Sequence, residues 1–374
     1  MTSTVVAVLG AGNGGLAAAA DLTLRGHEVR LFSRTDQALA PIRGAGGLSL
    51  EGTAGSGFAR PTLVTSDLAA AVDGAEVVML VVPSTALATY GRLLAPHLRN
   101  DQVVFLNPGG TGGSLAFAAA ARAAGLMGDL LVCETSTLTY ACRITGPAAV
   151  RISNVAPKLP FAAFPARHGA RVEEAVTALY PAIDRWANVL QTGLANLNAI
   201  EHPPQALLNT GWIEHTQGDF YFYYEGTTPS VGRVIDRVDE ERLALATALG
   251  SPVKPFVDAF CDAGYTTAEA AATGSAHTAL QCSEPNRWFK SPPSLDHRYV
   301  HEDVGHGLVP WSEWARMVGT PTPVIDSLIT IGGAVTGRNY RADGLTSSAM
   351  GVEGLDRAGL EAFLTDGPWE AVTR

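Results

Sequence analysis

Two short runs in the second half of the chain carry the side chains best suited to acid–base and carboxylate chemistry. Residues 196–204 read Asn-Leu-Asn-Ala-Ile-Glu-His-Pro-Pro, and residues 298–303 read Arg-Tyr-Val-His-Glu-Asp. Asn198 and His202 are four positions apart, so on a helix they share a face and can point into one cavity. The Pro-Pro pair after His202 interrupts helical hydrogen bonding, which often marks backbone that lines a cleft. On these residues alone, a structural histidine is the commoner outcome and a catalytic one the alternative.

A glycine-rich turn near the N-terminus has the spacing of a dinucleotide-binding loop. Residues 5–17 contain an apolar run, a G-x-G-x-x-G turn and the start of an Ala-rich stretch. Gly10 permits the tight turn, Gly12 lets backbone approach a pyrophosphate, and Gly15 lets the helix pack closely on the strand. The free N–H groups of the helix start favour phosphate. The expected cofactor contacts in this loop are Gly10, Gly12, Asn13, Gly14 and Gly15.

The residues after the second predicted strand bear on which nicotinamide cofactor is bound. An acidic residue about 20 positions past the glycines holds a free ribose 2′-OH in NAD-binding loops. Here Ser33 and Arg34 follow Phe32, and a hydroxyl with a guanidinium suits a 2′-phosphate. We therefore expect NADP(H). NAD(H) stays open, because Asp36 could reach the ribose while Arg34 stacks on the adenine or lies in solvent.

Two further loops follow predicted strands and are candidates for contact with the nicotinamide ring. Residues 82–85 read Val-Pro-Ser-Thr, and residues 106–113 read Leu-Asn-Pro-Gly-Gly-Thr-Gly-Gly. Glycine after a strand lets backbone lie close to a flat ligand. The expected contacts are Pro83, Pro108 and Gly109, and ordinary surface turns are the alternative.

The elements that must position these residues change in character along the chain. The first half alternates β-branched runs with Ala/Leu-rich stretches, which indicates βαβ units on a parallel sheet; the expected strands are residues 4–9, 28–32, 77–82, 103–106 and 130–134. After about residue 190 the apolar spacing becomes helical, at residues 196–210, 238–249, 267–273, 311–318, 322–331 and 356–364. We expect an α/β doubly wound Rossmann domain over residues 1–188 and a mostly α-helical substrate domain over residues 189–374.

Composition and charge exclude several other classes of protein. Of 374 residues, 47% are hydrophobic and 17% charged, which is too apolar for a disordered chain. A net charge of −10 and a pI of about 5.4 argue against nucleic acid as a partner. Charged Arg122 and Asp129 interrupt the Ala-rich run at residues 114–132, so we expect a helix and a strand there, not a membrane span.

The cysteines and the N-terminus indicate a compartment. Four cysteines show no C-x-x-C spacing or repeated framework, so we expect reduced thiols and no metal site. The N-terminus lacks a basic start and a small-residue cleavage site, and Gly10 and Gly12 interrupt any apolar region there. We therefore expect a cytoplasmic protein.

Several motifs taken together resemble the opine dehydrogenase family of the octopine/nopaline dehydrogenase type. They lie at residues 10–15, 107–109 with 112–113, 134–136 with 142–143, 198–203, 225–226 with 228–232, and 298–303 with 307–310. They span nearly the whole chain in the expected order. The resemblance implies a dinucleotide domain joined to a helical opine dehydrogenase domain. It also implies the NAD(P)H-dependent reductive condensation of an α-keto acid, usually pyruvate, with the amine of an L-amino acid.

The same resemblance implies roles for individual residues. His202 corresponds to the proton donor and acceptor for the imine, with Asp303 fixing its tautomer, as a carboxylate does beside other catalytic histidines. Arg298 corresponds to the arginine that grips the keto-acid carboxylate. For Arg298 and Asp303, a surface salt-bridge pair is the alternative. Asn198 would hold substrate through its amide, and Arg143 is a weaker candidate for a carboxylate of the amino acid. The family also implies a homodimer.

Some alternatives stay open at the level of sequence. The aromatic clusters at residues 220–224 and 288–289 suit either an apolar wall for a substrate side chain or a packing or dimer contact. One rival function is a ketopantoate-reductase-like or glycerol-3-phosphate-dehydrogenase-like hydroxy or keto acid dehydrogenase, although those enzymes usually depend on a lysine and the second half nearly lacks lysine. The other rival is a non-catalytic NAD(P) sensor.

Overall fold

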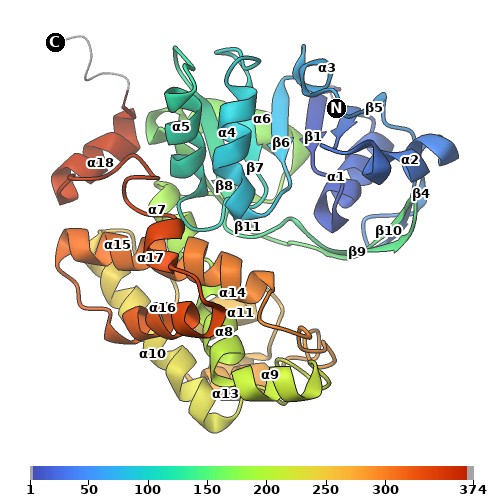
Figure 1. Cartoon of the computed structure of the whole chain (residues 1–374). Helices are drawn as coiled ribbons and strands as arrows, with labels where there is room; N and C mark the ends of the chain where they lie inside the picture. The colour runs from blue at the N-terminus through green and yellow to red at the C-terminus, as the bar shows by residue number, and fades with distance from the viewer. Residues whose placement is uncertain (1–2, 369–374) are drawn as a thin grey trace. The chain divides into compact units, whose positions relative to one another are not determined.

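A computed structural model describes residues 3–368, and the chain within it forms two compact units (Figure 1). One unit runs to Thr192 and also takes the chain from Glu361 onward, and the other is Gly193–Leu360. The sequence places everything after residue 188 in the second domain, so the structure differs in assigning the C-terminal segment to the first unit. Residues 1–2 and 369–374, the outer ends of the two expected domain ranges, lie outside the described residues.

The first unit is built on an eight-stranded sheet. Its order is β12-β11-β8-β7-β6-β1-β2-β5, with all neighbours parallel except β11 against β8. The bounds are β1 (Val5–Leu9), β2 (Glu28–Phe32), β5 (Leu63–Thr65), β6 (Val77–Leu80), β7 (Val103–Leu106), β8 (Leu131–Thr135), β11 (Leu159–Phe164) and β12 (Ile183–Arg185). The strand order reverses at β1, between β2 and β6. In doubly wound sheets, ligands bind outside the carboxyl ends of the strands at such a point.

Helices cover both faces of this sheet. Alternate residues of the central strands face a core shared with α1 and α6, while the intervening Ala7, Val78 and Val104 are equally buried. This double burial explains the continuous apolar runs of the sequence. The helices are α1 (Asn13–Leu24), α2 (Asp36–Ala45), α3 (Leu68–Val72), α4 (Leu87–Leu94), α5 (Gly113–Ala123) and α6 (Gly169–Leu179). Figure 1 shows α4 and α5 side by side. The expected doubly wound α/β fold and all five expected strands are confirmed to within two residues at each end.

A second, four-stranded sheet of order β4-β3-β10-β9 was not expected from the sequence. Its strands are β3 (Leu48–Gly52), β4 (Gly57–Ala59), β9 (Tyr140–Gly146) and β10 (Ala149–Val155), and they pack on α1. The Tyr140 hydroxyl donates to Asp21 Oδ2 of α1 at 2.7 Å. β3 and β9 are each largely exposed on one face. The two pairs β3–β4 and β9–β10 join only where β3 meets β10, across about a hundred residues of chain, so local apolar alternation alone did not reveal this sheet.

The second unit is helical, as the sequence predicts. It contains α8 (Leu197–Leu208), α9 (Thr210–Thr216), α10 (Pro229–Ala248), α11 (Phe256–Asp262), α12 (Ala268–Ala271), α13 (Ala276–Gln281), α14 (Arg298–Asp303), the π-helix η3 (Val304–Leu308), α15 (Val309–Val318), α16 (Pro323–Thr336) and α17 (Tyr340–Asp343). Helix α10 begins well before the expected residue 238, because Thr228 caps it and Pro229 is favourable at a first helical position. Two helices cross the boundaries between the units: α7 (Val189–Leu194) and α18 (Arg357–Asp366).

A buried arginine fixes the start of the second unit. Arg242 on α10 is 1% exposed, pairs with Asp239 and donates to the carbonyls of Leu194 and Lys254, both at 2.7 Å. Asp239 also accepts from the backbone N–H of Phe256 at 2.8 Å. The pair is therefore fully hydrogen-bonded, which is the condition for burying charge without a large penalty.

We expect Arg242→Ala to lower the free energy of unfolding of the helical unit by about 3–5 kcal/mol, because Asp239 would remain as an uncompensated buried charge. Arg237→Ala on the same helix is the control, since its pair with Glu240 is more than half exposed and such pairs are worth about 0–1 kcal/mol. Urea unfolding of both variants measures this. Equal losses for the two arginines would contradict the interpretation.

Candidate functional site

In the glycine turn after β1, protein atoms leave no room for a side chain at Gly10 or Gly15, whereas Gly12 has room for one. A Cβ on Gly10, whose φ is +127°, would lie 2.3 Å from the Val81 carbonyl oxygen, and a Cβ on Gly15 would lie 1.9 Å from the Gly10 oxygen. Gly12 has no atom within 4 Å of its Cβ position. It is also the N-cap of α1, and no side chain caps that helix. The turn therefore offers open backbone beside a helix start, which fits a pyrophosphate.

The other two expected residues of this loop have structural contacts. Asn13 Oδ1 accepts from the backbone N–H of Ile144 on β9 at 2.7 Å. A Cβ on Gly14 would lie 2.8 Å from a methyl of Val81 and 3.0 Å from Leu138. These contacts join the loop to β9 and to the segment after β6. They explain the residue types at both positions without a cofactor, because Asn13 supplies the hydrogen-bond acceptor and Gly14 leaves room for the neighbouring side chains.

The end of β2 presents a free guanidinium and an occupied carboxylate. Arg34 is exposed and makes no ion pair within residues 3–368, and Ser33 beside it is half-buried. Asp36 accepts from Arg43 Nη1 at 2.7 Å and from Ser66 Oγ at 2.9 Å. These hydrogen bonds hold the pKa of Asp36 below its usual value. The carboxylate that could have held a ribose hydroxyl is thus already paired.

The glycine-rich loop after β7 lies on a buried carboxyl group. Pro83 is exposed at the start of the loop after β6, and Pro108 is half-buried in the loop after β7. A Cβ on Gly109 would lie 2.3 Å from Glu134 Oε2. Gly110 has a φ of +67° and Gly112 a φ of +73°, a region that favours glycine. The backbone conformation therefore favours glycine at positions 110 and 112, and the closeness of Glu134 requires glycine at position 109. These reasons hold independently of any ligand.

Glu134, at the end of β8, was part of the motif set but not of the expected site. It is fully buried; its Oε2 accepts from the N–H and Oγ of Ser114 at 3.0 and 2.6 Å, and its Oε1 from Thr192 Oγ1 at 2.5 Å. Burial raises the pKa of Glu134 to about 7, although these hydrogen bonds oppose the shift. One side chain thus supports the Gly109 loop, the start of α5 and the last residue before the second unit.

In the second unit, the structure brings together the two residues expected to handle a proton. His202 Nδ1 lies 2.7 Å from Asp303 Oδ2, and both side chains are almost fully buried. His202 is on α8 and Asp303 ends α14, just before the π-helix η3. A Cβ on Gly307 would lie 2.7 Å from the Ala199 Cβ, so glycine there permits η3 to pack closely on α8. Contrary to the expected interruption, Pro203 lies inside α8 and the helix continues to Leu208.

Two tyrosines complete the surroundings of the imidazole, and sequence reasoning did not assign them a role. The Tyr223 hydroxyl lies 2.8 Å from His202 Nε2 and 3.4 Å from the Tyr299 hydroxyl. The Tyr299 ring stacks on the imidazole with centroids 3.9 Å apart. Burial, with the carboxyl of Glu201 nearby, raises the pKa of Tyr223 well above its ordinary value. Tyr223 is therefore a neutral phenol, and the imidazole contacts the Asp303 carboxyl through Nδ1 and the Tyr223 hydroxyl through Nε2.

A second carboxyl group is buried beside this pair. Glu201 Oε1 lies 3.9 Å from His202 Nε2, and Glu201 Oε2 has no hydrogen-bond partner among the described residues. Burial and the charge of Asp303 raise the pKa of Glu201 well above its ordinary value. Burial therefore favours the protonated form of Glu201. In the sequence, the position of Glu201 directly before His202 was the only indication that the two side chains are close. Adjacent residues do not share a face of a helix, so helical spacing did not predict this contact.

The residues expected to bind substrate lie on exposed or half-buried surfaces. The Arg298 side chain is 56% exposed, and its Nε lies 3.3 Å from Glu302 Oε2. Its salt bridge is thus with Glu302, whereas Asp303 is buried against His202. Asn198 is half-buried, and its side chain makes no hydrogen bond within residues 3–368. Arg143 belongs to the first unit, where it is exposed on β9 and donates to the Cys142 carbonyl at 3.0 Å. Arg298 and Asn198 thus share the helical unit with His202.

The aromatic clusters divide between core and surface. Phe220 and Phe222 are buried, whereas Trp288 is 63% and Phe289 40% exposed. Arg287 lies over the rings of both Tyr224 and Trp288. Phe222 and Tyr223 of the first cluster pack beside His202, and part of the second cluster faces solvent.

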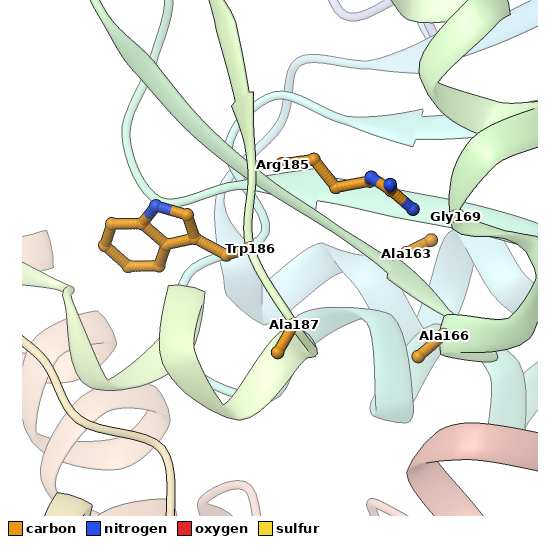
Figure 2. A pocket seen from close by; sticks show the side chains of 6 residues that line it. All are labelled: Ala163, Ala166, Gly169, Arg185, Trp186 and Ala187. Atoms are coloured by element: carbon orange, nitrogen blue, oxygen red, sulfur yellow. The ribbon is translucent and has the colours of Figure 1, made fainter.

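A surface hollow in the first unit has no acid–base group for catalysis. Figure 2 shows this hollow of about 310 Å³, with the Arg185 side chain pointing toward Gly169 and the Trp186 indole pointing away from it. Arg185 Nε pairs with Glu173 Oε2 at 2.8 Å. Residues 3–368 contain no group of three or more His, Cys, Asp or Glu side chains arranged to hold a metal ion. No helix in the same range is long and apolar enough to span a membrane.

Comparison with known protein families connects both units to dehydrogenases. Residues 185–336 match the family model described as NAD/NADP octopine/nopaline dehydrogenase, alpha-helical domain. Residues 5–111 match the NAD-dependent glycerol-3-phosphate dehydrogenase N-terminus. An opine dehydrogenase from Arthrobacter sp. (strain 1C) is 36% identical over 360 residues, covering 96% of this chain and 98% of the relative.

Solved structures confirm the fold over nearly the whole chain. Octopine dehydrogenase with NADH and L-arginine aligns with a TM-score of 0.77 at 20% identity, covering 97% of this chain and 98% of that one. Yersinopine dehydrogenase with NADP+ bound aligns with a TM-score of 0.72 at 18% identity, covering 98% of each chain. At such identities the likeness establishes the architecture alone.

We expect Gly15→Ala and Gly12→Ala to separate stability from cofactor affinity. The methyl of the first would meet the Gly10 carbonyl and lower the free energy of unfolding by about 1–3 kcal/mol. The second meets nothing in the protein, so its stability should change by less than about 1 kcal/mol, while NADPH affinity falls by at least about tenfold, or about 1.4 kcal/mol. Urea unfolding and NADPH fluorescence titration measure the two effects. Unchanged NADPH affinity in Gly12→Ala would remove Gly12 from the pyrophosphate site.

We expect Glu134→Gln to remove one component of the pH dependence of stability. Below pH 4.5 both the folded and the unfolded state hold the proton of Glu134; between 4.5 and about 7 only the folded state holds it, so stability falls as pH rises. At about 1.4 kcal/mol per unit this loss amounts to about 3 kcal/mol. Urea unfolding across that range should show wild type losing stability relative to Glu134→Gln. Parallel pH curves for the two proteins would show that Glu134 is ionised in the folded state.

Proposed function

The chain belongs to the opine dehydrogenase family, and from this premise we propose that it reduces the imine formed between an α-keto acid and the amine of an L-amino acid. Pyruvate is the proposed keto acid. The observation that carries the proposal is the buried His202–Asp303 pair at 2.7 Å, in the unit that matches the family's helical domain. The reaction belongs to the oxidoreductases acting on CH–NH groups.

His202 has the properties required of the proton donor. Imine reduction adds a hydride to carbon and a proton to nitrogen, and the nicotinamide supplies the hydride when bound. Histidine exchanges protons near neutral pH. Asp303 accepts from Nδ1, which fixes the tautomer and stabilises the imidazolium, so Nε2 is the nitrogen that handles the transferred proton.

Substrate carboxylates require fixed cations, and the helical unit offers one. We assign Arg298 to the keto-acid carboxylate, because its side chain is more than half exposed and a planar guanidinium can pair with a carboxylate through two donors. The Asn198 amide lies one helical turn from His202 and makes no hydrogen bond within residues 3–368, so it is suited to a second substrate contact. Arg143 is assigned to the amino-acid carboxylate with less support, since its exposure is the observation in its favour.

We propose that the cofactor is NADP(H) in preference to NAD(H). The open backbone at Gly12 fits the pyrophosphate of either one. The choice rests on the free Arg34 and on Asp36, which is occupied by Arg43 and Ser66 and so does not compete for the ribose. Pro83, Pro108 and Gly109 are assigned to the nicotinamide end. The solved relatives contain either NADH or NADP+, so family membership alone leaves this choice open.

The rival functions have weaker support. The glycerol-3-phosphate dehydrogenase match is confined to residues 5–111, the part concerned with the cofactor. A ketopantoate-reductase-like enzyme and a non-catalytic NAD(P) sensor both leave the buried His202 and Asp303 without a reason for their contact. We also propose a homodimer, to be tested by light scattering, and a cytoplasmic location, supported by the free thiols of the four cysteines.

The test follows NADPH or NADH absorbance with pyruvate, before and after addition of a panel of L-amino acids. Oxidation only when both keto acid and amine are present establishes imine reduction, and the faster cofactor tests the role of Arg34. Oxidation with a keto acid alone would assign the protein to the hydroxy-acid dehydrogenases. No oxidation with any pair would favour the sensor.

We expect His202→Ala to lower kcat by about 10² to 10⁴, the usual contribution of a general acid–base group. NADPH affinity should stay near the wild-type value, because the expected cofactor contacts lie in the first unit. His215→Ala is a matched control, since that histidine is exposed on α9. Steady-state kinetics and NADPH titration measure the outcome. Wild-type turnover in His202→Ala would exclude His202 as the proton donor.

A further inference from the structure

The catalytic histidine has no free ring nitrogen. Nδ1 contacts Asp303 at 2.7 Å and Nε2 contacts the Tyr223 hydroxyl at 2.8 Å. One face of the ring is stacked on Tyr299 at 3.9 Å, and only 4% of the His202 side chain is exposed. A substrate nitrogen therefore reaches His202 only if Tyr223 leaves Nε2, or else it exchanges its proton with Tyr223.

Tyr223 is held firmly where it meets the imidazole. The preceding Phe222 donates its backbone N–H to the Phe289 carbonyl at 2.9 Å, and Phe220 accepts from Ser291 at the same distance. A Cβ on Gly226 would lie 2.3 Å from the Phe222 oxygen, so the turn that follows is closely packed. The backbone that carries Tyr223 is thus fixed on both sides, and Tyr223 itself is only 7% exposed.

The hydroxyl has the protonation state that a relay requires. Burial raises the pKa of Tyr223 well above its ordinary value, so it is a neutral phenol that can give one proton while receiving another. The Tyr299 hydroxyl at 3.4 Å orients it from the other side. Glu201 Oε1 lies 3.9 Å from Nε2, farther than the Tyr223 hydroxyl, so the hydroxyl is the closer proton acceptor.

We propose that Tyr223 is the proton relay of the proposed reaction, passing the proton of His202 to the substrate nitrogen. The step begins with the imine carbon already reduced and with His202 as the imidazolium, protonated at both ring nitrogens. The N–H bond at His202 Nε2 then breaks and an O–H bond forms at Tyr223. In the same step the original Tyr223 O–H bond breaks and its proton binds the lone pair of the amine nitrogen. His202 becomes neutral, Tyr223 remains a phenol, and no electrons are transferred in this step.

A relay role for Tyr223 and a Tyr223 hydroxyl that substrate merely displaces predict opposite changes in kcat when the hydroxyl is removed. If Tyr223 only occupied the place that substrate takes, its removal would leave Nε2 open and kcat equal or higher. As a relay, its removal interrupts proton delivery, and Tyr223→Phe should lower kcat by about 10² or more. The KM for keto acid and the affinity for NADPH should change by less than about threefold. Tyr265→Phe in the same unit is the control, because its hydroxyl makes no hydrogen bond within residues 3–368.

A double variant and isotope effects separate a relay from a packing role. Residues acting as one unit are non-additive, so Tyr223→Phe should cost little further activity once His202 is Ala. The relay moves two protons in one step, so the solvent deuterium effect of wild type should fit two exchanging sites and that of Tyr223→Phe one. Two results would overturn the relay. One is that the losses in kcat of the two single variants multiply in the double variant, and the other is that wild type and Tyr223→Phe show the same number of exchanging sites.

The inference rests on the proposed function, so one readout is independent of turnover. In protein without substrate, the ¹⁵N resonance of His202 Nε2 should shift in Tyr223→Phe while that of Nδ1 stays near its wild-type position. An unshifted Nε2 would show that the hydroxyl does not bind the imidazole, and would overturn the relay whether or not the enzyme reduces imines. A shifted Nε2 in a protein without imine reduction would refute the proposed function and, with it, the relay.

Discussion

The helical unit depends on the burial of an imidazole against a carboxylate. Removing such groups from water costs several kcal/mol unless every polar atom finds a partner. His202 meets that condition at both ring nitrogens, through Asp303 and Tyr223, and Asp303 meets it at Oδ2, while burial favours the protonated form of neighbouring Glu201. The close packing of η3 on α8 at Gly307 and Ala199 is what permits this burial. The buried His202–Asp303 pair therefore depends on the small residues Gly307 and Ala199, which let η3 and α8 approach each other.

The first unit solves a similar problem with a single carboxyl group. Glu134 lies where three segments meet, and its two oxygens accept from Ser114 and Thr192. A neutral apolar residue there would leave those donors unpaired, whereas a fully ionised one would carry a larger desolvation cost. The pKa of Glu134, about 7, reflects both effects, because burial raises it and the hydrogen bonds from Ser114 and Thr192 lower it. Both units therefore use a buried acid to fix loops near their expected sites.

The sequence predicted what depends on local pattern and missed what depends on distant pairing. The central strands, the glycine turn and the longer helices of the second unit, α8, α10, α15 and α16, follow from apolar spacing and turn chemistry. The sheet containing β9 and β10 did not, because β3 and β10 meet across about a hundred residues. Tyr223 also escaped, since its neighbours in sequence are aromatic core residues and its contact with His202 arises only when the segment before α10 folds onto α8. Asp303 came from family resemblance, not from spacing.

The glycines of the first loop are kept for different reasons, and this has an evolutionary consequence. Gly10 and Gly15 are excluded from substitution by protein atoms within 2.3 Å, whereas Gly12 faces open space. In a descendant that had lost its cofactor, selection on folding would preserve the first two and release the third. Drift at Gly12 with retention of Gly10 and Gly15 is therefore a mark by which inactive members of the lineage can be recognised from sequence.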